Sequence, residues 1–319
     1  MLSKIKIKTI LIITGLLLNF FNLYAVEEPT PYSFLSNNIS ARSAGLAGAS
    51  VSFDYDVAGI YSNPALLGVQ HTNNIYLTFL KHLLDINSGN AMYVFCDTTY
   101  GKFAASVIYT SYGSFDYYDE LGNPSGGSFT GDLIALSGTY ANTIADRLYG
   151  GATLKLAYNH IEKINGIAVV VDAGLLYKLS DERTNFGFSI LNAGTELKKI
   201  NNVSSRIPLD VKLGFNHRLR GLPLNFNFGF NHLSSDEDFF KRFGNINIGA
   251  ELYIGEYVQI RGGFDNYIRK NLATSQNKGL AGLSAGVGIV IPNIINIDYA
   301  VSIYSNDLYL HRFGLNFNF

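Results

Sequence analysis

Cysteine, tryptophan and charged residues are scarce in this chain of 319 residues. Cys96 is the single cysteine, so no intrachain disulfide can form, and we expect it to be a small apolar wall residue rather than a reactive thiol. Charged residues make up 15% of the chain, against about a quarter in a typical soluble domain. No apolar run after residue 25 is long enough for a membrane-spanning helix. The net charge of −1 gives no support to nucleic-acid binding, which needs a basic face.

The sequence also lacks a recognisable metal site or catalytic constellation. Its six histidines are spread along the chain without metal-ligand spacing. His160 and His232 are expected near one rim of the fold, the latter close to residues 234–236, but their spacing does not define a catalytic triad. The acidic run 236–238 lacks the ligand pattern of a dedicated Ca²⁺ loop and is expected to be a solvated loop. We therefore predict a protein that is not an enzyme and has no catalytic, metal or cofactor-binding residues.

The N-terminus has the pattern of a secretory signal peptide over residues 1–25. Lys4, Lys6 and Lys8 form a basic start, and residues 10–18 form a short apolar core. Tyr24-Ala25 is a suitable cleavage point. The alternative is an uncleaved anchor, but the apolar run is short and is interrupted by polar and glycine residues.

Apolar and polar residues alternate along most of the chain after residue 70. The two faces of one segment are Leu224, Phe226, Phe228 and Phe230 against Asn225, Asn227, Gly229 and Asn231. Segments 153–159, 246–252, 295–302 and 313–319 follow the same pattern, and a period of two predicts β-strands. A β-sandwich would also alternate. Strands near ten residues long, with one face rich in Asn, Gly, Ser and Thr, favour a membrane barrel with a wet lumen.

The connections between these segments alternate between short and long. Short ones are expected near residues 97–100, 142–146, 180–183, 220–223, 255–257 and 292–294. Between them lie 112–128, 195–206, 234–243 and 266–277, together with the shorter 83–88, 160–165 and 304–307. The pattern predicts an all-β fold, a transmembrane antiparallel up-and-down β-barrel of about 14 strands over residues 71–319. The short set would face the periplasm and the long set the outside, so the protein would be integral to the bacterial outer membrane.

Face parity predicts the pairing of one hairpin. Ile254 and Val258 should both face lipid, which requires an odd number of residues between them or a bulge. With three residues, Glu251 and Arg261 lie directly opposite each other in the lumen. The other charged residues expected to point inward are Lys155, Asp172, Lys178, Asp210, Lys212 and Asp298. Because both signs occur, we expect mutual pairing across the lumen rather than strong ion selectivity.

Residues 26–70 do not alternate, and we predict that they form a hatch inside the barrel. Small residues between positions 41 and 50 allow close packing against another backbone. Asn63-Pro64 suits the N-cap and first position of a helix, and a barrel of this width has a lumen to fill. The candidate hatch residues are Gly45, Gly48, Asp54, Asp56, Asn63, Pro64 and Ala65.

Two stretches carry a resemblance to known barrels. The run 41–68, with its glycine-rich start, paired aspartates and closing Asn-Pro-Ala-Leu-Leu, resembles the N-terminal hatch of FadL-like barrels. The run 112–124, Tyr-Gly-Ser-Phe-Asp-Tyr-Tyr-Asp-Glu-Leu-Gly-Asn-Pro, is similar to the PorV/PorQ family of type IX secretion outer-membrane proteins, and closest to PorQ. Segments 127–132, 240–243 and 278–288 resemble PorQ in the same order. The resemblance implies a non-enzymatic barrel that anchors or shuttles components of the type IX secretion and surface attachment complex.

The outer connections are the predicted contacts with such protein partners. The candidate contact residues are Phe115, Asp116, Asp119, Glu120, Asn123 and Pro124. The alternative is a FadL-like outer-membrane channel that admits small hydrophobic molecules through the hatch. A channel of that kind needs an apolar pocket between hatch and wall, whereas the predicted inner faces are Asn-rich and charged. Outer-membrane lipid surrounds the protein in both cases.

Overall fold

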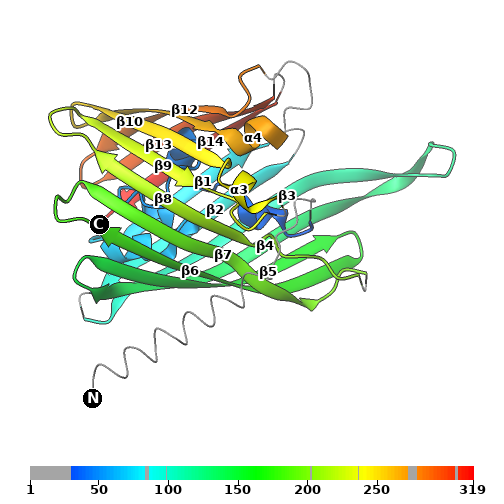
Figure 1. Ribbon diagram of the computed structural model, residues 1–319. Coiled ribbons are helices and arrows are strands. Elements are labelled where there is room, and N and C mark those ends of the chain that lie inside the picture. Colours follow the sequence, from blue (N-terminus) through cyan, green and yellow to red (C-terminus); the bar gives the residue numbers. More distant parts are fainter. Residues whose placement is uncertain are drawn as a thin grey trace.

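The computed structural model describes residues 30–82, 86–97, 99–201, 203–235, 237–271, 279–305 and 308–319. The predicted signal peptide, residues 1–25, and the first predicted hatch residues, 26–29, lie outside these ranges. In the described part of the chain, fourteen strands close into one antiparallel barrel (Figure 1). Each strand pairs with its sequence neighbours, and the first pairs with the last. The predicted up-and-down barrel of 14 strands is confirmed.

The strands vary in length from seven residues to 22. Their bounds are β1 Asn74–Lys81, β2 Asn87–Asp97, β3 Gly101–Tyr118, β4 Pro124–Ala145, β5 Leu148–Ile161, β6 Ile164–Lys178, β7 Thr184–Lys198, β8 Asp210–Arg218, β9 Leu224–Phe230, β10 Ile246–Ile254, β11 Val258–Asp265, β12 Leu283–Ile291, β13 Ile295–Ser305 and β14 Leu308–Asn318.

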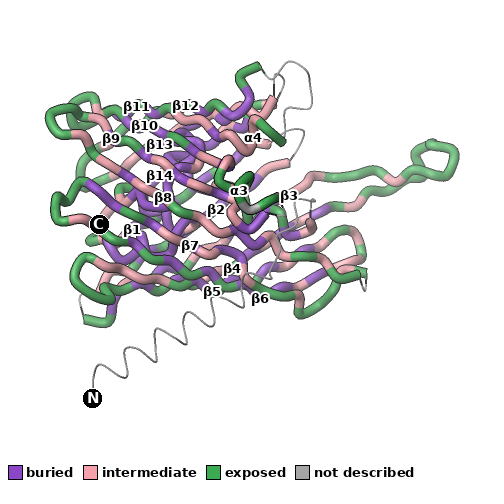
Figure 2. The backbone as a smooth tube through the Cα atoms, in the orientation of Figure 1, coloured by how far each residue is buried: buried purple, intermediate pink, exposed green. Residues whose placement is uncertain are grey.

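Burial alternates from residue to residue along most of the strands, as the alternating colours of the tube in Figure 2 show. In β1, Tyr76 and Leu80 are buried, whereas Ile75, Leu77 and Phe79 are exposed on the outside. Exposed Leu, Ile, Val, Phe and Tyr side chains recur in this way along most of the strands. An apolar outer surface of this extent is favourable against lipid and not against water.

The described helices are all short. None of them is long and apolar enough to cross a membrane.

The lumen has two chemically different sides. Strands β2 to β6 contribute buried apolar side chains, among them Met92, Ile108, Leu133 and Val170. Strands β7 to β14 contribute buried polar and charged side chains, which include Asn185, Asn216, Asn225, Asn227, Asn247, Glu251, Arg261, Asp298 and Arg312. The expectation of an Asn-rich and charged inner face therefore holds for β7 to β14 and only in part for β2 to β6. In β2 to β6 the inner face mixes apolar residues with polar ones such as Asn90, Thr110 and Lys155, which weakens the contrast between the two faces.

Residues 30–70 lie in the lumen. They contain η1 (Ser33–Ser36), α2 (Ala41–Gly45), η2 (Val57–Tyr61) and η3 (Pro64–Val69). Helix α2 packs on β11 to β14, whereas η3 packs on β3 to β6. Contacts with both sides of a closed barrel place this segment inside it, where the blue helices lie in Figure 1. We call residues 30–70 the hatch.

The two rims of the barrel differ in their connections. One rim carries only short turns, including residues 146–147, 255–257 and 292–294, and we call it the short-turn rim. The other carries α3 (Phe239–Arg242), α4 (Asn266–Asn271) and the tip of the β3–β4 hairpin, and we call it the loop rim. The β10–β11 turn has three residues and pairs Ile254 with Val258, as parity predicts.

The connection expected at residues 112–128 is not a loop. Strands β3 and β4 continue through it to Tyr118 and Pro124, which leaves a turn of residues 119–123. The extension forms because Phe115 lies opposite Phe129, and the two rings stack with centroids 5.3 Å apart. Gly113 adopts a positive φ of 81° at a register shift, which marks a bulge within the extended strand pair.

Candidate functional site

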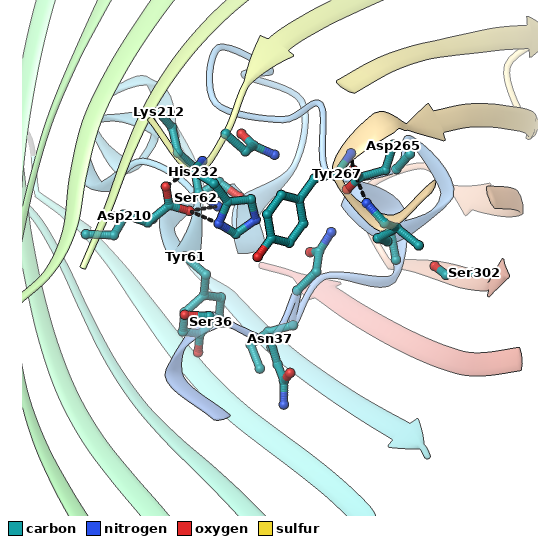
Figure 3. Close-up of a pocket in the computed structure, with 18 of the residues that line it drawn as sticks. Ser36, Asn37, Tyr61, Ser62, Asp210, Lys212, His232, Asp265, Tyr267 and Ser302 are labelled. Atoms are coloured by element: carbon teal, nitrogen blue, oxygen red, sulfur yellow. Dashed lines mark hydrogen bonds and ion pairs between the residues drawn. The ribbon is translucent and has the colours of Figure 1, made fainter. Parts of the chain in front are cut away.

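The candidate site is a cavity of about 180 Å³ inside the barrel, between the hatch and the loop rim. Hatch residues 35–39 form one wall. The opposite wall comes from the loop-rim ends of the polar strands, including Asp210, Lys212 and His232, and from Tyr267 of α4 (Figure 3). The cavity therefore lies where the hatch and the polar side of the barrel meet.

Two cationic side chains line the cavity, Arg312 and Lys212. Arg312 is 2% exposed; its guanidinium donates to Asn38 O at 2.8 Å and to Ser302 Oγ at 3.1 Å. It makes no ion pair with any residue the structure describes. The Lys212 ammonium lies 3.6 Å from Asp210 Oδ2, beyond hydrogen-bond distance. A buried cation without a counter-charge is costly, so Arg312 favours an anionic group beside it, whereas Asp210 and Asp265 supply the negative charge elsewhere in the lining.

A second group in the lining joins aromatic rings and acceptors. The His232 ring stacks on Tyr267 with centroids 4.1 Å apart, and its Nδ1 lies 3.6 Å from Asp210 Oδ2. Figure 3 shows both rings pointing into the cavity. Asn231 is 5% exposed, and its Oδ1 has no hydrogen-bond partner among the described residues. The site can therefore accept a hydrogen bond as well as hold negative charge.

A buried ionic network lies between the hatch and strands β10 to β13. Arg42 of α2 contacts Glu251 through two hydrogen bonds, of 2.6 Å and 2.9 Å. The same carboxylate contacts Arg261 Nε at 2.5 Å, and Arg261 Nη1 reaches Asp298 at 2.6 Å. Glu251 and Arg261 face each other in the register, which is the arrangement that parity predicts. The network has two charges of each sign, so its net charge is zero.

Two further inward-facing ion pairs lie outside this network. Lys155 contacts Asp172 at 2.6 Å, and Lys178 contacts Asp54 of the hatch at 2.7 Å. The predicted inward charges are thus paired along the wall or with the hatch rather than across the lumen, and Lys212 is the loosest member of the set. None of these pairs defines a conducting path.

The candidate hatch residues attach the hatch to itself and to the wall. Asn63 caps η3 through Ala65 N at 3.0 Å, and its Nδ2 donates to Leu175 O of β6 at 2.9 Å. Pro64 is the first residue of η3, and its backbone lies against Gly151 of β5, where an added Cβ would overlap it. These contacts fix the short-turn side of the hatch.

The other candidate hatch residues lie near α2. Gly45 packs against Gly286 of β12, and Gly48 has a positive φ of 78° that favours glycine. Asp56 accepts hydrogen bonds from the Ser40 hydroxyl and from Ala58 N, the latter at 3.1 Å. Burial raises the pKa of the Asp56 carboxyl above its ordinary value, although the Arg42 charge acts in the opposite direction.

The candidate partner-contact residues lie at the tip of the β3–β4 hairpin, outside the barrel. Asp119 closes the turn by accepting from Leu121 N at 2.9 Å and Asn123 N at 2.8 Å. The Asn123 backbone bond is the largest cause that lowers the pKa of Asp119. Phe115 is 44% exposed, and Asp116, Glu120 and Pro124 are exposed. These residues are therefore distant from the cavity and form a separate surface.

Sequence reasoning missed Arg42 and Arg312. Arg42 stands in a run of small residues with no periodicity, so nothing marked it as a lumen residue. For Arg312 a signal existed, because the lumen-facing positions Gly314, Asn316 and Asn318 extend back by two residues to Arg312. Arg42 is the hatch residue of the ionic network, and Arg312 is the buried cation of the cavity.

Comparison with known proteins identifies the fold. No family model and no curated protein matches the sequence. The structure matches the toluene transporter TbuX of Ralstonia pickettii with a TM-score of 0.57 at 15% identity, over 94% of this chain and 100% of that chain. It matches the Pseudomonas putida toluene transporter TodX with a TM-score of 0.60 at 14% identity, over 87% and 97%. A Pseudomonas aeruginosa FadL homologue gives 0.51 at 12% identity, over 92% and 98%.

These similarities define a class of fold. The chain has the fold of FadL-type outer-membrane barrels, with fourteen strands and an N-terminal segment in the lumen.

Proposed function

We propose that the protein is an outer-membrane channel for small amphipathic molecules that carry an anionic head. The observation that carries this proposal is the buried Arg312 guanidinium, which has no carboxylate partner in the described residues and lines a cavity beside Lys212. Leu35, Ile39 and Leu191 supply apolar lining in the same cavity. A carboxylate there would receive charge-assisted hydrogen bonds, and its apolar part would lie on these side chains.

The solved structures with this fold support a channel rather than an enzyme. They include toluene transporters and a monoaromatic hydrocarbon channel. The loop rim would face the outside and the short-turn rim the periplasm, as in the sequence-based orientation. Ligand would then enter the cavity first and pass inward only after the hatch moves.

Arg312→Met is expected to weaken binding of octanoate by about tenfold to a hundredfold. Hydrogen bonds to charged groups contribute about 1.5–3 kcal/mol, and each 1.4 kcal/mol is tenfold in affinity. Binding is measured by calorimetry on the full-length protein in detergent micelles, with 1-octanol as the uncharged probe. Lys163→Met, an exposed lysine in the β5–β6 turn, is the matched control and should bind octanoate as the unmodified protein does.

Two results would contradict the channel proposal. Equal affinity for octanoate and 1-octanol would show that the anionic head is not recognised. An unchanged dissociation constant in Arg312→Met would show that recognition happens elsewhere.

A second candidate function is favoured by a different observation. The β3–β4 hairpin projects beyond the loop rim and carries the candidate contact residues (Figure 1). Such a projection suits a PorV/PorQ-like role, in which the barrel anchors or shuttles components of a type IX secretion and surface attachment complex. This role needs no passage through the lumen.

Replacing residues 114–130 by a two-residue Asn-Gly turn tests this second candidate. The barrel pairings below the rim involve other residues, so the variant should still insert into the outer membrane. We expect loss of most of the surface-attached cargo protein, measured in washed outer membranes, while octanoate binding persists. If the variant instead keeps the surface-attached cargo protein but loses octanoate uptake, the channel is the better explanation.

A further inference from the structure

The part of the β3–β4 hairpin beyond the loop rim is a two-stranded ribbon with an open edge. Strand β2 pairs with β3 only as far as Ser111, and β5 pairs with β4 only from Gly131. Beyond these points β3 and β4 pair only with each other in the part of the chain that the structure describes. We call residues 112–130 the ribbon. Figure 1 shows it extending well past the other connections.

Hydrogen bonding at the base of the ribbon shows which backbone groups face its open edge. Glu162 N, in the β5–β6 turn, donates to Thr130 O at 3.1 Å, so the backbone groups of Thr130 point away from β3. Ser114 lies opposite Thr130 and is therefore a non-hydrogen-bonded pair with it. Because the two kinds of pair alternate, Ser114 and Asp116 present their N–H and C=O groups at the β3 edge.

The β3 edge lacks the proline and lysine residues that often block strand addition. Residues 112–118 contain no proline and no lysine, although two register shifts interrupt their pairing. Between those shifts, Ser114 to Asp116 pair in regular register. An open edge of this kind is a template for one more strand.

Aromatic packing stabilises the conformation of the ribbon. Phe129 lies between Phe115 and Tyr117, with centroids 5.3 Å from each. The Tyr117 hydroxyl donates to Glu162 Oε1 at 2.9 Å, which braces the ribbon on the β5–β6 turn. An added strand would pack beside an apolar face, and little conformational entropy of the ribbon would be lost on binding.

Charge selects the kind of partner. The ribbon contains three acidic residues, Asp116, Asp119 and Glu120, and no basic residue. An anionic lipid surface and a second copy of the ribbon would both bring like charges together, which is unfavourable. A segment with lysine or arginine would bring opposite charges together. The partner is therefore a basic protein segment and neither lipid nor another copy.

We propose that the β3 edge of the ribbon binds an extended basic segment of a partner protein by strand addition. The main-chain groups of Ser114 and Asp116 pair with the added strand, and its basic side chains lie near Asp116 and Glu120. The inference deepens the second proposed function, surface docking, and is independent of the channel. It assigns the docking mode, the edge used and the chemistry of the partner.

A labelled peptide of about ten residues, with alternating lysine and valine, is the probe. We expect saturable binding to the full-length protein in detergent micelles, and weaker binding as salt is raised. Ser114→Pro should reduce the affinity about three- to tenfold, because it removes one edge donor without breaking a ribbon hydrogen bond. Ser128→Pro is the matched control, since Ser128 lies opposite Asp116 and faces the other edge.

Hydrogen exchange of the unmodified protein keeps the test independent of folding in the variants. Peptide addition should slow exchange of the Ser114 and Asp116 amides. Strand addition is wrong if these amides are unaffected, if the corresponding glutamate–valine peptide binds equally well, or if Ser128→Pro weakens binding as much as Ser114→Pro. Cargo lost on replacement of the ribbon but retained in Ser114→Pro would leave surface docking intact and overturn this mode alone.

Discussion

Glu251→Ala is expected to destabilise the folded barrel by about 3–5 kcal/mol and to free the hatch from β10. The side chain is 0% exposed and its carboxylate contacts both Arg42 and Arg261. Removing it leaves two buried guanidinium groups with Asp298 as the only remaining carboxylate of the network. An uncompensated buried charge is among the largest single-residue penalties in proteins.

Two measurements test the expected loss of stability and release of the hatch in Glu251→Ala. Unfolding in urea, monitored by tyrosine fluorescence in detergent micelles, gives the change in stability. Trypsin cleavage after Arg42 reports hatch release, because Arg42 is buried in the unmodified protein. Glu256→Ala, in the exposed β10–β11 turn, is the matched control and should leave both unchanged.

A double variant separates charge imbalance from lost packing. Arg42→Met with Glu251→Met leaves the Arg261–Asp298 pair, which is neutral by itself. Much of the lost stability should return, since apolar replacement of a buried ion pair is often neutral or stabilising. A double variant as unstable as Glu251→Ala would assign the effect to packing.

The sequence predicted the fold where each strand has one apolar face and one polar face. In β9 and β10 the two faces differ at every residue, so strand, face and even the Glu251–Arg261 pairing follow from periodicity. In β3 the lumen side mixes the apolar Ala104 and Ile108 with Lys102 and Thr110. Periodicity cannot separate an apolar outer face from an inner face that is itself partly apolar, and the signal weakens for that physical reason.

The candidate site was less accessible to sequence reasoning. Arg312 follows from parity, but its lack of a carboxylate partner depends on which residues the thirteen other strands and the hatch bring near it. Arg42 pairs with a residue more than 200 positions away. Such contacts join segments without a shared period, so composition and spacing could suggest only that inward charges would pair.

Gly263→Leu is expected to displace the hatch and convert a closed barrel into a conducting one. Gly263 of β11 faces the lumen, where an added Cβ would lie 2.5 Å from Leu46 C and 2.6 Å from Ala47 N. These are backbone atoms of the hatch, so no side-chain rotation relieves the overlap. The adjacent Gly262 meets nothing within 4 Å on the outer side, which makes Gly262→Leu a control on the same strand.

Conductance in planar bilayers measures this displacement directly. A barrel of fourteen strands encloses a wide lumen, so loss of the hatch from one wall should raise ion conductance by at least about tenfold. Gly262→Leu should conduct as the unmodified protein does, because its side chain points outward. Equal conductance in Gly263→Leu and Gly262→Leu, with both folded, would mean that β11 can move outward and keep the hatch. The close approach at Gly263 would then not hold the lumen closed.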